Sequence, residues 1–534
     1  MLMTQTIELA PDYYLHNFRK LTQHATEFYS DLLTSAELNW VGQFDALNTD
    51  AQCLLVRLLS RKGHWFRSDK LNYTEIINLS EAIYKLSHHG FIQISPVLTQ
   101  SEAVSSLLTK PELCKAFPQL KSTCTKSDLI SQLPSSFSAS LNNVEFIELK
   151  DADIITTLLV LFFANTRQDL SQFVLDDLGV HQFEKYPLPT EARYFRTRSE
   201  VEALIQISHA KDSYYSLENK TIDLLVNILK QLPHSSHPSI QRKREALINT
   251  LARDLERLGA YDDALAWFAK STLPPSRERQ ARIFDKQDDI ANMESIVNAI
   301  LDSPYNIEEK EIGEKLQTRL MRKQKHKVPR VNKPKVAEDR LTLDLTTQRV
   351  ELAAKSHYEA QGWQVFYSEN LLLNGLFGLT FWSVIFADID KAFVNRYQHR
   401  PLDLYHSDFA KKRAPQIEAI LTQIHNGDLD FILRTFEQKQ GIANPFVHWK
   451  WLPLELIEQA IKHIPHNTLA EILRVFLSDI KLFRTGMPDL ILFNEHSYRW
   501  VEVKGPGDKL QDNQWRWIRE FQRLEVPVRV CWVE

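Results

Sequence analysis

The sequence lacks the features that mark membrane-spanning, exported and zinc-binding proteins. Its 534 residues contain no run of about 18 uncharged apolar residues, which argues against a transmembrane helix. The N-terminal segment carries acids where a signal peptide needs a basic start and an apolar centre. Only four cysteines are present, and they form neither a CxxC pair nor a cluster with zinc-ligand spacing. We therefore expect reduced thiols and a cytoplasmic protein.

A strong charge of one sign is also missing. Basic residues number 64 and acidic residues 68, so the net charge is −4. No global field then attracts the chain to nucleic acid, and any such contact must come from local basic patches. A hydrophobic content of 43% is enough for folded cores, and the length predicts about three or four domains.

Two small helical modules are predicted at the N-terminus. Residues 1–100 read as helices followed by a glycine turn at Gly90 into a short strand, which fits a winged-helix-like DNA-binding module or a plain helical packing domain. Residues 101–135 contain two helices, the first with Thr109 as N-cap and Pro111 in its first turn, and the second capped by Thr125 or Ser127. This pair resembles the SAP helix-extended-helix motif, although any short helical hairpin gives a similar pattern.

Residues 136–310 are predicted to be helical, and the stretch 258–270 resembles a tetratricopeptide repeat. In that reading Gly259 and Ala264 are small because two helices approach closely, and an isolated helical hairpin is the alternative. Residues 311–340 are rich in lysine and arginine and contain Pro329 and Pro334. They are predicted to form a basic linker that is either solvated or in contact with phosphate.

The last part of the chain, residues 341–534, has the pattern of an α/β core. An apolar helix is expected over 371–389, a helical insertion over about 401–478, and strands around Leu490, around Val501 and over 526–533. The fold class is therefore a multidomain, mainly α-helical chain with a C-terminal α/β core.

Three residues on the predicted strands suggest chemistry. Asp489 follows Pro488 before one apolar run, and Glu502 and Lys504 lie two residues apart in the next. Alternation on a strand places Glu502 and Lys504 on one face and Val503 in the core, and a hairpin would bring Asp489 beside them. Two carboxylates and an ammonium suit a hard cation and phosphodiester hydrolysis. A turn acid beside an ordinary ion pair is the structural alternative.

A third carboxylate would complete a cation site, and Glu369 is the candidate. It follows the strand expected at 364–368 and precedes an apolar helix, so capping of that helix is its alternative role. Glu351, on the preceding helix, is a reserve candidate.

Residues 369–534 resemble the Fanconi-associated nuclease family, whose catalytic unit is the virus-type replication-repair nuclease (VRR-NUC) domain of the PD-(D/E)xK superfamily. The resemblance rests on Ser368-Glu369 and on the segments 378–386, 401–404, 484–490, 501–510, 514–517 and 528–533. It implies a structure-selective DNA nuclease, dependent on Mn²⁺ or Mg²⁺, that cuts 5′ flaps and digests from 5′ ends as a phosphodiesterase I-type exonuclease in interstrand-crosslink repair. Such an enzyme would work at the nucleoid of a bacterial-type cell.

The resemblance also assigns roles. It implies metal ligands at Glu369, Asp489, Glu502 and the backbone carbonyl of Val503, and a water-orienting role for Lys504. Gln514 is expected either to support the attacking water or to be an ordinary surface glutamine.

The family recognises a 5′-terminal phosphate, for which the chain offers Arg277, Arg279 and Arg282. Arg484 and Lys509 flank the catalytic strands and are candidate contacts to the scissile strand, and structural ion pairs are the alternative for all five. The ubiquitin-binding zinc finger of eukaryotic members has no counterpart in the sequence, so recruitment by ubiquitin is not expected.

Two other functions remain open from the sequence. One is a junction-resolving or restriction-type nuclease of the same superfamily, which the helical insertion disfavours. The other is a helical-repeat interaction scaffold that carries an inert nuclease fold.

Overall fold

The computed structural model describes residues 10–94, 97–98, 107–118, 123–132, 137–138, 144–168, 170, 173, 182–328, 334–346 and 348–534. The chain divides into two compact units, the first from residues 1–180 and 195–209 and the second from residues 181–194 and 210–534. Helix α10 (Arg198–Tyr215) begins in the first unit and ends in the second. In the described ranges, no helix combines the length and apolar character needed to cross a membrane.

The first unit begins with a helical module around a small sheet. Strand β5 (Phe146–Leu149) lies between β1 (Trp65–Arg67) and β2 (Ile92–Ile94) and is antiparallel to both. The aromatic rings of Phe18, Trp40 and Phe44 pack together in the helical core. The module's helices are α1 (Tyr13–Tyr29), α2 (Ser35–Ala46), α3 (Thr49–Leu59), the 3-10 turn η1 (Ser68–Lys70) and α4 (Leu79–His88).

A pair of short capped helices follows, as the sequence predicts. Thr109 and Thr125 each form a capping box, at the start of α6 (Lys110–Ala116) and α7 (Lys126–Ser131), respectively. Leu113 and Leu129 are fully buried in the small core that these helices share. The unit also contains the strand pair β3 (Val97–Leu98) and β4 (Phe137–Ser138) and helix α8 (Ile154–Phe163). The end of the predicted SAP-like region, residues 133–135, lies outside the described residues.

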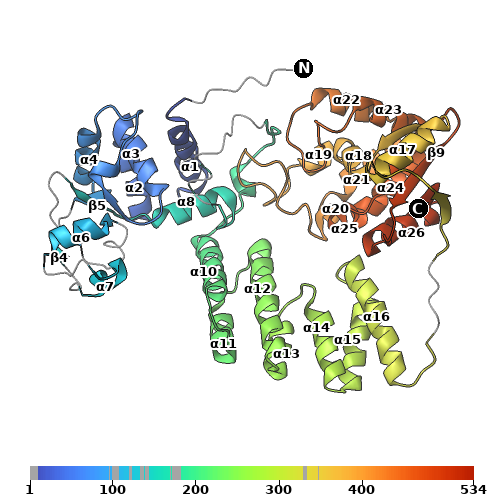
Figure 1. Ribbon diagram of the computed structural model, residues 1–534, viewed down its shortest axis with the longest axis horizontal. Helices are drawn as coiled ribbons and strands as arrows, with labels where there is room; N and C mark the ends of the chain where they lie inside the picture. The colour runs from blue at the N-terminus through green and yellow to red at the C-terminus, as the bar shows by residue number, and fades with distance from the viewer. Residues whose placement is uncertain are drawn as a thin grey trace. The chain divides into compact units, whose positions relative to one another are not determined.

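The second unit contains a row of helices, each packed against its neighbour in the sequence (Figure 1). They are α11 (Ile222–Gln231), α12 (Pro238–Arg257), α13 (Tyr261–Phe268), α14 (Ser276–Lys286), α15 (Ile290–Asp302) and α16 (Ile307–Lys323). Ala264 is fully buried in this row. The prediction for Gly259 was wrong in its reason, because a Cβ there would meet no atom within 4 Å. The backbone φ of +82° at the turn between α12 and α13 explains the glycine instead.

The boundaries of the predicted basic linker differ from the structure. Residues up to Lys323 belong to α16, and β6 (Ala337–Leu341) already pairs with the C-terminal strand. The long apolar side of α16, with Leu316 and Leu320 buried, extends the helix where the basic residues alone suggested a linker. Pro329, Arg330 and Lys333 lie outside the described residues.

The catalytic candidates sit on a five-stranded mixed sheet with strand order β6-β10-β9-β8-β7. Strand β10 (Val528–Val533) is parallel to β6 and β9 (Tyr498–Lys504), whereas β8 (Leu490–Phe493) is antiparallel to β9 and to β7 (Gln364–Tyr367). Strands β8 and β9 form the predicted hairpin.

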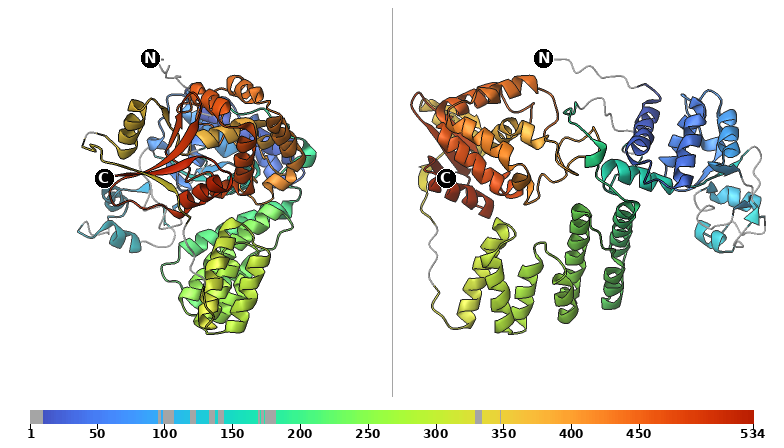
Figure 2. Two further views of the ribbon diagram at one scale, coloured as in Figure 1. Left: turned by 90° about the vertical axis from the view of Figure 1, so that its right-hand side faces the viewer. Right: turned by 180° about the vertical axis from the view of Figure 1, so that it is seen from behind.

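Alternation along the strands gives the sheet two apolar faces. Val501 and Val503 pack with α17 (Val350–Ala360) on one face. Trp500 faces the other side, where it packs on Phe521 of α26 (Asp512–Arg523). The twist of the strands beside α26 can be followed in Figure 2. Glu502 and Lys504 continue the Trp500 face, so they point toward α26.

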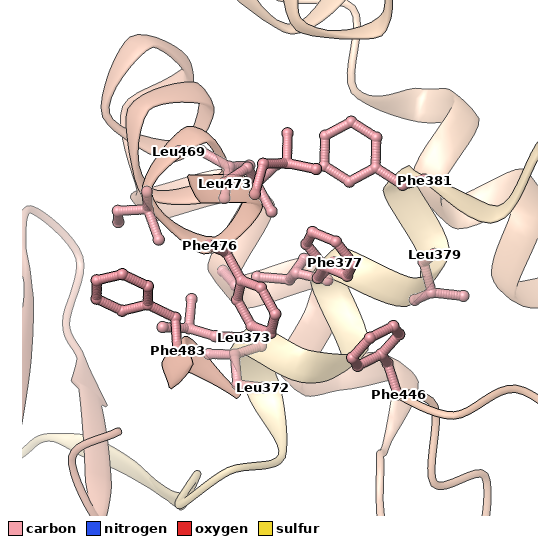
Figure 3. Packing of buried hydrophobic residues seen from close by; sticks show 14 of the residues in the cluster. Leu372, Leu373, Phe377, Leu379, Phe381, Phe446, Leu469, Leu473, Phe476 and Phe483 are labelled. Carbon is pink, nitrogen blue, oxygen red and sulfur yellow. The ribbon is translucent and has the colours of Figure 1, made fainter. Parts of the chain in front are cut away.

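The helical insertion forms the largest core of the unit. The predicted apolar helix over 371–389 is divided at Phe381 into α18 (Leu372–Thr380) and α19 (Trp382–Ile385). Phe377 of α18 stacks on Phe476 of α24 (His466–Ser478) with ring centroids 4.3 Å apart (Figure 3). The remaining helices are α20 (Phe409–Lys412), α21 (Ala414–His425), α22 (Asp430–Gln438), α23 (Leu454–His463), α24 (His466–Ser478) and α25 (Ile480–Phe483).

Candidate active site

Three carboxylates lie at one end of three neighbouring strands. Glu369 follows β7, Asp489 immediately precedes β8, and Glu502 lies near the end of β9. The register pairs Tyr367 with Leu490 and Leu490 with Val501, so the three junctions meet at the same edge. The sheet topology therefore brings together the acids that the sequence predicts as ligands.

Asp489, Glu502 and Lys504 form a buried polar group. Their exposed fractions are 8%, 1% and 8%. The backbone N–H of Val503 donates a 2.8 Å hydrogen bond to Oδ2 of Asp489, and Nζ of Lys504 lies 2.7 Å from Oε1 of Glu502. The predicted convergence of these side chains is present in the structure. Val503 itself points its side chain into the core beneath them.

The electrostatics of this group favour a bound cation. Burial raises the pKa of Glu502 to about 8, and the nearby charges of Asp489 and Glu369 act in the same direction. Burial also raises the pKa of Asp489 to about 6, assisted by Glu369 and Glu351, against the opposing Val503 N–H and Lys504. One ammonium does not offset several carboxylates, so a bound cation would stabilise their ionised forms.

Glu369 is exposed and held by two neighbours that the sequence interpretation missed. The hydroxyl of Tyr367 donates a short hydrogen bond to its Oε2, and Nδ2 of Asn370 donates one of 3.2 Å to its Oε1. Tyr367 is two residues before Glu369, so strand alternation was the signal that could have identified it. These contacts orient a carboxylate that is otherwise free to rotate in solvent.

Helix α26 contributes one side chain to the site. Nε2 of Gln514 donates a 2.6 Å hydrogen bond to Oε1 of Glu502, and its Oε1 accepts one from the backbone N–H of Gln511. Gln514 is therefore a member of a capping box as well as a neighbour of the carboxylate. Gln514 therefore contacts a carboxylate of the site, and its support of the attacking water stays a prediction.

A tight turn fixes α26 against the aspartate. Gly486 has φ of +82°, and a Cβ built there would lie 2.7 Å from the backbone carbon of Asn513. Nε1 of Trp517 also donates a 3.1 Å hydrogen bond to the carbonyl of Phe483. Since only glycine fits this approach, the turn before Asp489 and the start of α26 are held in register.

The donor set fits a hard divalent cation, although the acids are not yet gathered around one point. In the described part of the chain, no group of three or more His, Cys, Asp or Glu side chains has the spacing of a preformed ion site. Asp489, Glu502 and Glu369 nevertheless offer carboxylate oxygens, which Mg²⁺ and Mn²⁺ prefer. The raised pKa values of two of them show that neutralising positive charge would be stabilising there.

The arginines predicted to bind a 5′ phosphate all contact acids on the helical row. Arg277 pairs with Glu309 at 2.5 Å, Arg279 pairs with Glu256, and Arg282 lies 2.7 Å from Glu278. Arg277 and Arg279 have side chains only 14% and 13% exposed, whereas that of Arg282 is 40% exposed. Their partners lie on α12, α14 and α16, so the geometry supports structural ion pairing and leaves Arg282 the most accessible of the three.

The two basic residues that flank the catalytic strands are exposed. Nη1 of Arg484 donates a 2.7 Å hydrogen bond to the hydroxyl of Tyr405. Lys509 forms no ion pair within the described ranges and lies on the loop between β9 and α26. Both remain accessible to an anionic ligand.

Two family models match the chain. The FAN1, HTH domain model covers residues 12–93, and the VRR-NUC domain model covers residues 426–534. The second match includes Asp489, Glu502, Lys504 and Gln514, whereas Glu369 lies before it.

The chain is also similar to characterised relatives over nearly its whole length. The Fanconi-associated nuclease 1 homolog of Pseudomonas aeruginosa is 34% identical, with 98% of this chain and 96% of the relative covered. Fanconi-associated nuclease 1 of Homo sapiens is 24% identical, and the homolog of Oryza sativa is 28% identical; this chain spans 62% of the length of each.

Solved structures are also similar to this chain over nearly its whole length. A crystal structure of paFAN1 bound to 5′-flap DNA with a two-nucleotide flap and a gap matches with a TM-score of 0.84 and 32% identity, and covers 98% of each chain. A second paFAN1 complex, with a one-nucleotide 5′ flap, matches with a TM-score of 0.82 and 33% identity.

Proposed function

The chain belongs to the Fanconi-associated nuclease family of DNA-hydrolysing enzymes, and we propose that it cuts 5′-flap DNA and digests DNA from 5′ ends through the site at Asp489 and Glu502. The observation that carries this proposal is the convergence of Glu369, Asp489, Glu502 and Lys504 at one edge of the sheet. An inert scaffold would have no use for two buried carboxylates with raised pKa values.

Hydrolysis in this family depends on a divalent cation. We propose Mn²⁺ or Mg²⁺, held by Glu369, Asp489, Glu502 and the backbone carbonyl of Val503. When bound, such an ion stabilises negative charge that develops on the phosphate and lowers the pKa of a water molecule.

The chain's own residues would then position the reactants. Lys504 is held at 2.7 Å from Glu502, so its ammonium is fixed where it can orient the attacking water or a phosphate oxygen. Gln514 restrains the same carboxylate from α26, and Val503 restrains Asp489 through its N–H. These contacts keep two ligands in place before substrate arrives.

The similar structures support a proposal for the form of the DNA. The paFAN1 complexes contain 5′-flap DNA, and this chain is similar to them over 98% of its length. We therefore propose branched DNA with a 5′-phosphorylated flap as substrate, in interstrand-crosslink repair at the nucleoid. Arg484 and Lys509 are proposed contacts to the scissile strand, and Arg282 is the best placed of the three arginines for a 5′ phosphate.

In this proposal different parts of the chain bind the DNA, present it and cut it. Residues 1–100 and 101–135 would bind duplex DNA as winged-helix-like and SAP-like modules. The predicted tetratricopeptide-like region 136–310 begins too early, because β5 and α8 belong to the first unit. The row of helices from α11 to α16 would present the substrate to the nuclease domain, residues 341–534. The match of the HTH model to residues 12–93 supports the first of these assignments.

The test is cleavage of matched synthetic substrates by purified protein. We expect a 5′ flap to be cut faster than a 3′ flap or a four-way junction, with Mn²⁺ or Mg²⁺ required and Ca²⁺ inactive. Asp489→Ala should abolish cleavage without loss of folding. Faster cleavage of the four-way junction would favour a junction-resolving enzyme, and wild-type activity of Asp489→Ala would disprove catalysis at this site.

A further inference from the structure

Two guanidinium groups approach the ring of one tyrosine beside the active site. Cζ of Arg400 is 5.0 Å from the centroid of the Tyr405 ring, and Cζ of Arg484 is 5.1 Å from the same centroid. Nη1 of Arg484 also donates the 2.7 Å hydrogen bond to the tyrosine hydroxyl. Within the described ranges neither arginine has a carboxylate partner, so two positive charges meet at one aromatic ring without neutralisation.

The acids closest to this group in the sequence are already paired elsewhere. Asp403 accepts hydrogen bonds of 2.8 and 3.0 Å from the fully buried guanidinium of Arg413. Asp408 lies 2.9 Å from Nζ of Lys412. The two acids nearest to Arg400 and Tyr405 in the sequence are therefore engaged with other cations.

His406, which follows Tyr405 in the sequence, lies in the same positive environment. Burial lowers its pKa, and the guanidinium of Arg242 on α12 lowers it further, despite the opposing charges of Asp408 and Asp403. Arg242 has no ion pair among the described residues. A third guanidinium therefore contributes to the positive potential at this surface.

The group is joined to the catalytic edge by one buried amide. Nδ2 of Asn374 donates hydrogen bonds to the carbonyl of Asn370, at 2.6 Å, and to the carbonyl of Arg484, at 3.1 Å. Asn370 in turn donates to Glu369. The position of Arg484 is thus coupled to that of a proposed cation ligand through two side chains.

We propose that Arg400, Tyr405 and Arg484 form a clamp for an internal phosphodiester of the DNA strand that is cut, next to the bond at the carboxylate site. This proposal rests on the proposed function, because it names a further contact for the same substrate. Guanidinium groups recognise phosphate through paired N–H donors, and contact with the Tyr405 ring limits their motion. The hydroxyl of Tyr405 accepts from Arg484, so its own hydrogen remains available to a phosphate oxygen.

The clamp makes a quantitative prediction about binding that does not depend on cleavage. In an Asp489→Asn background, Arg400→Ala should weaken binding of 5′-flap DNA about 5- to 10-fold. The slope of the logarithm of the binding constant against the logarithm of the salt concentration should fall by about 1, the value of one lost phosphate contact. Arg400→Lys should keep most of the salt slope but lose part of the affinity. The matched control is Arg474→Ala, because Arg474 is an arginine of the same insertion paired with Glu418 on the surface, and it should change the dissociation constant less than about twofold.

A scan with methylphosphonates identifies the contacted phosphate. Each phosphate of the flap junction is replaced in turn by a neutral methylphosphonate, and binding is measured with the Asp489→Asn protein and with the same protein carrying Arg400→Ala. At one internal position, the methylphosphonate should weaken binding by the Asp489→Asn protein. At the same position it should have little further effect on the protein that also carries Arg400→Ala. The penalty of Arg400→Ala should be the same for 5′-phosphate and 5′-hydroxyl ends.

Three results would overturn the clamp. These are unchanged affinity in Arg400→Ala, equal methylphosphonate penalties in both proteins at every position, or a penalty confined to 5′-phosphorylated ends. Thermal unfolding of the variants verifies that each is folded. If wild-type protein cuts no DNA but the binding results appear as expected, the clamp stands and the proposed catalysis fails.

Discussion

Gln514 and Lys504 contact the same oxygen of Glu502. Nε2 of Gln514 donates to Oε1 at 2.6 Å, and Nζ of Lys504 lies 2.7 Å from that atom. Both contacts restrain one carboxylate oxygen from two directions, so the orientation of the second oxygen is fixed as well. An outer contact of this kind sets the geometry of a cation ligand without touching the cation.

Loss of the Gln514 contact should therefore weaken catalysis more than stability. We expect Gln514→Ala to reduce kcat, or the apparent affinity for Mn²⁺, about 10-fold or more. Gln522→Ala is the matched control, because Gln522 is on the same helix and donates instead to the carbonyl of Lys335. Cleavage of a 5′ flap at several Mn²⁺ concentrations measures both quantities. Equal effects of the two substitutions would assign Gln514 to helix capping alone.

The stability of the cation-free protein should fall as the pH rises. The pKa of Glu502 is about 8 in the folded protein against an ordinary value of 4.5, so between these values the folded state retains a proton that the unfolded state releases. The folded state is thus favoured at low pH, and this stabilisation is lost as the pH rises from about 4.5 to about 8.

Glu502→Gln should remove the part of this dependence that comes from Glu502 and leave the part that comes from the raised pKa of Asp489. In EDTA near pH 8.5 we expect the unfolding free energy of the variant to exceed that of wild type by on the order of a few kcal/mol, and its unfolding temperature to be higher. Near pH 5 the difference in unfolding free energy should be smaller. Added Mn²⁺ should stabilise the wild type more than the variant. Parallel pH profiles for the two proteins would show that Glu502 is not protonated in the folded state.

The sequence predicted the hairpin of β8 and β9 because the patterns that determine it are local. Alternation placed Glu502 and Lys504 on one face, and two apolar runs separated by a short turn implied that Asp489 would lie beside them. Glu369 came from the family resemblance, since its junction is more than a hundred residues away along the chain. The same resemblance suggested Gln514.

The arginine contacts show what could not be predicted. Arg277 pairs with Glu309 and Arg279 with Glu256, and these acids are 32 and 23 residues away on other helices. The sequence shows a basic helix start, but the partners depend on how the helices stack. Gly259 is a related case, because small size and positive φ both select glycine and only the backbone distinguishes them.

The turn at Gly486 should be intolerant of any side chain. Gly486→Ala requires a strained φ and also places Cβ 2.7 Å from the backbone of Asn513. Gly441 has a similar φ of +84°, but its Cβ would meet nothing within 4 Å, so Gly441→Ala measures the backbone strain alone. We expect about 1 kcal/mol for Gly441→Ala and about 2 to 4 kcal/mol for Gly486→Ala, with loss of cleavage in the second only. Similar unfolding free energies for both would mean that α26 moves freely.

The three arginines of α14 should separate into structural and accessible classes. Arg277→Ala leaves the carboxylate of Glu309, 1% exposed, without its cation, whereas after Arg279→Ala the equally buried Glu256 keeps Arg253 and Lys286 as partners. Removing one partner of a buried pair is destabilising by about 3 kcal/mol, so Arg277→Ala should lose about that much stability and Arg279→Ala less, and both should bind phosphorylated and unphosphorylated flaps in the wild-type ratio. Arg282 is 40% exposed and pairs within its own helix, so Arg282→Ala should leave stability nearly unchanged.

A 5′-phosphate contact at this helix would then appear as a reduced preference for phosphorylated ends in Arg282→Ala, measured as the ratio of kcat/KM for the two ends. An unchanged ratio in Arg282→Ala would exclude it from the 5′-phosphate site, and a changed ratio in Arg277→Ala at full stability would contradict the structural role assigned to that residue.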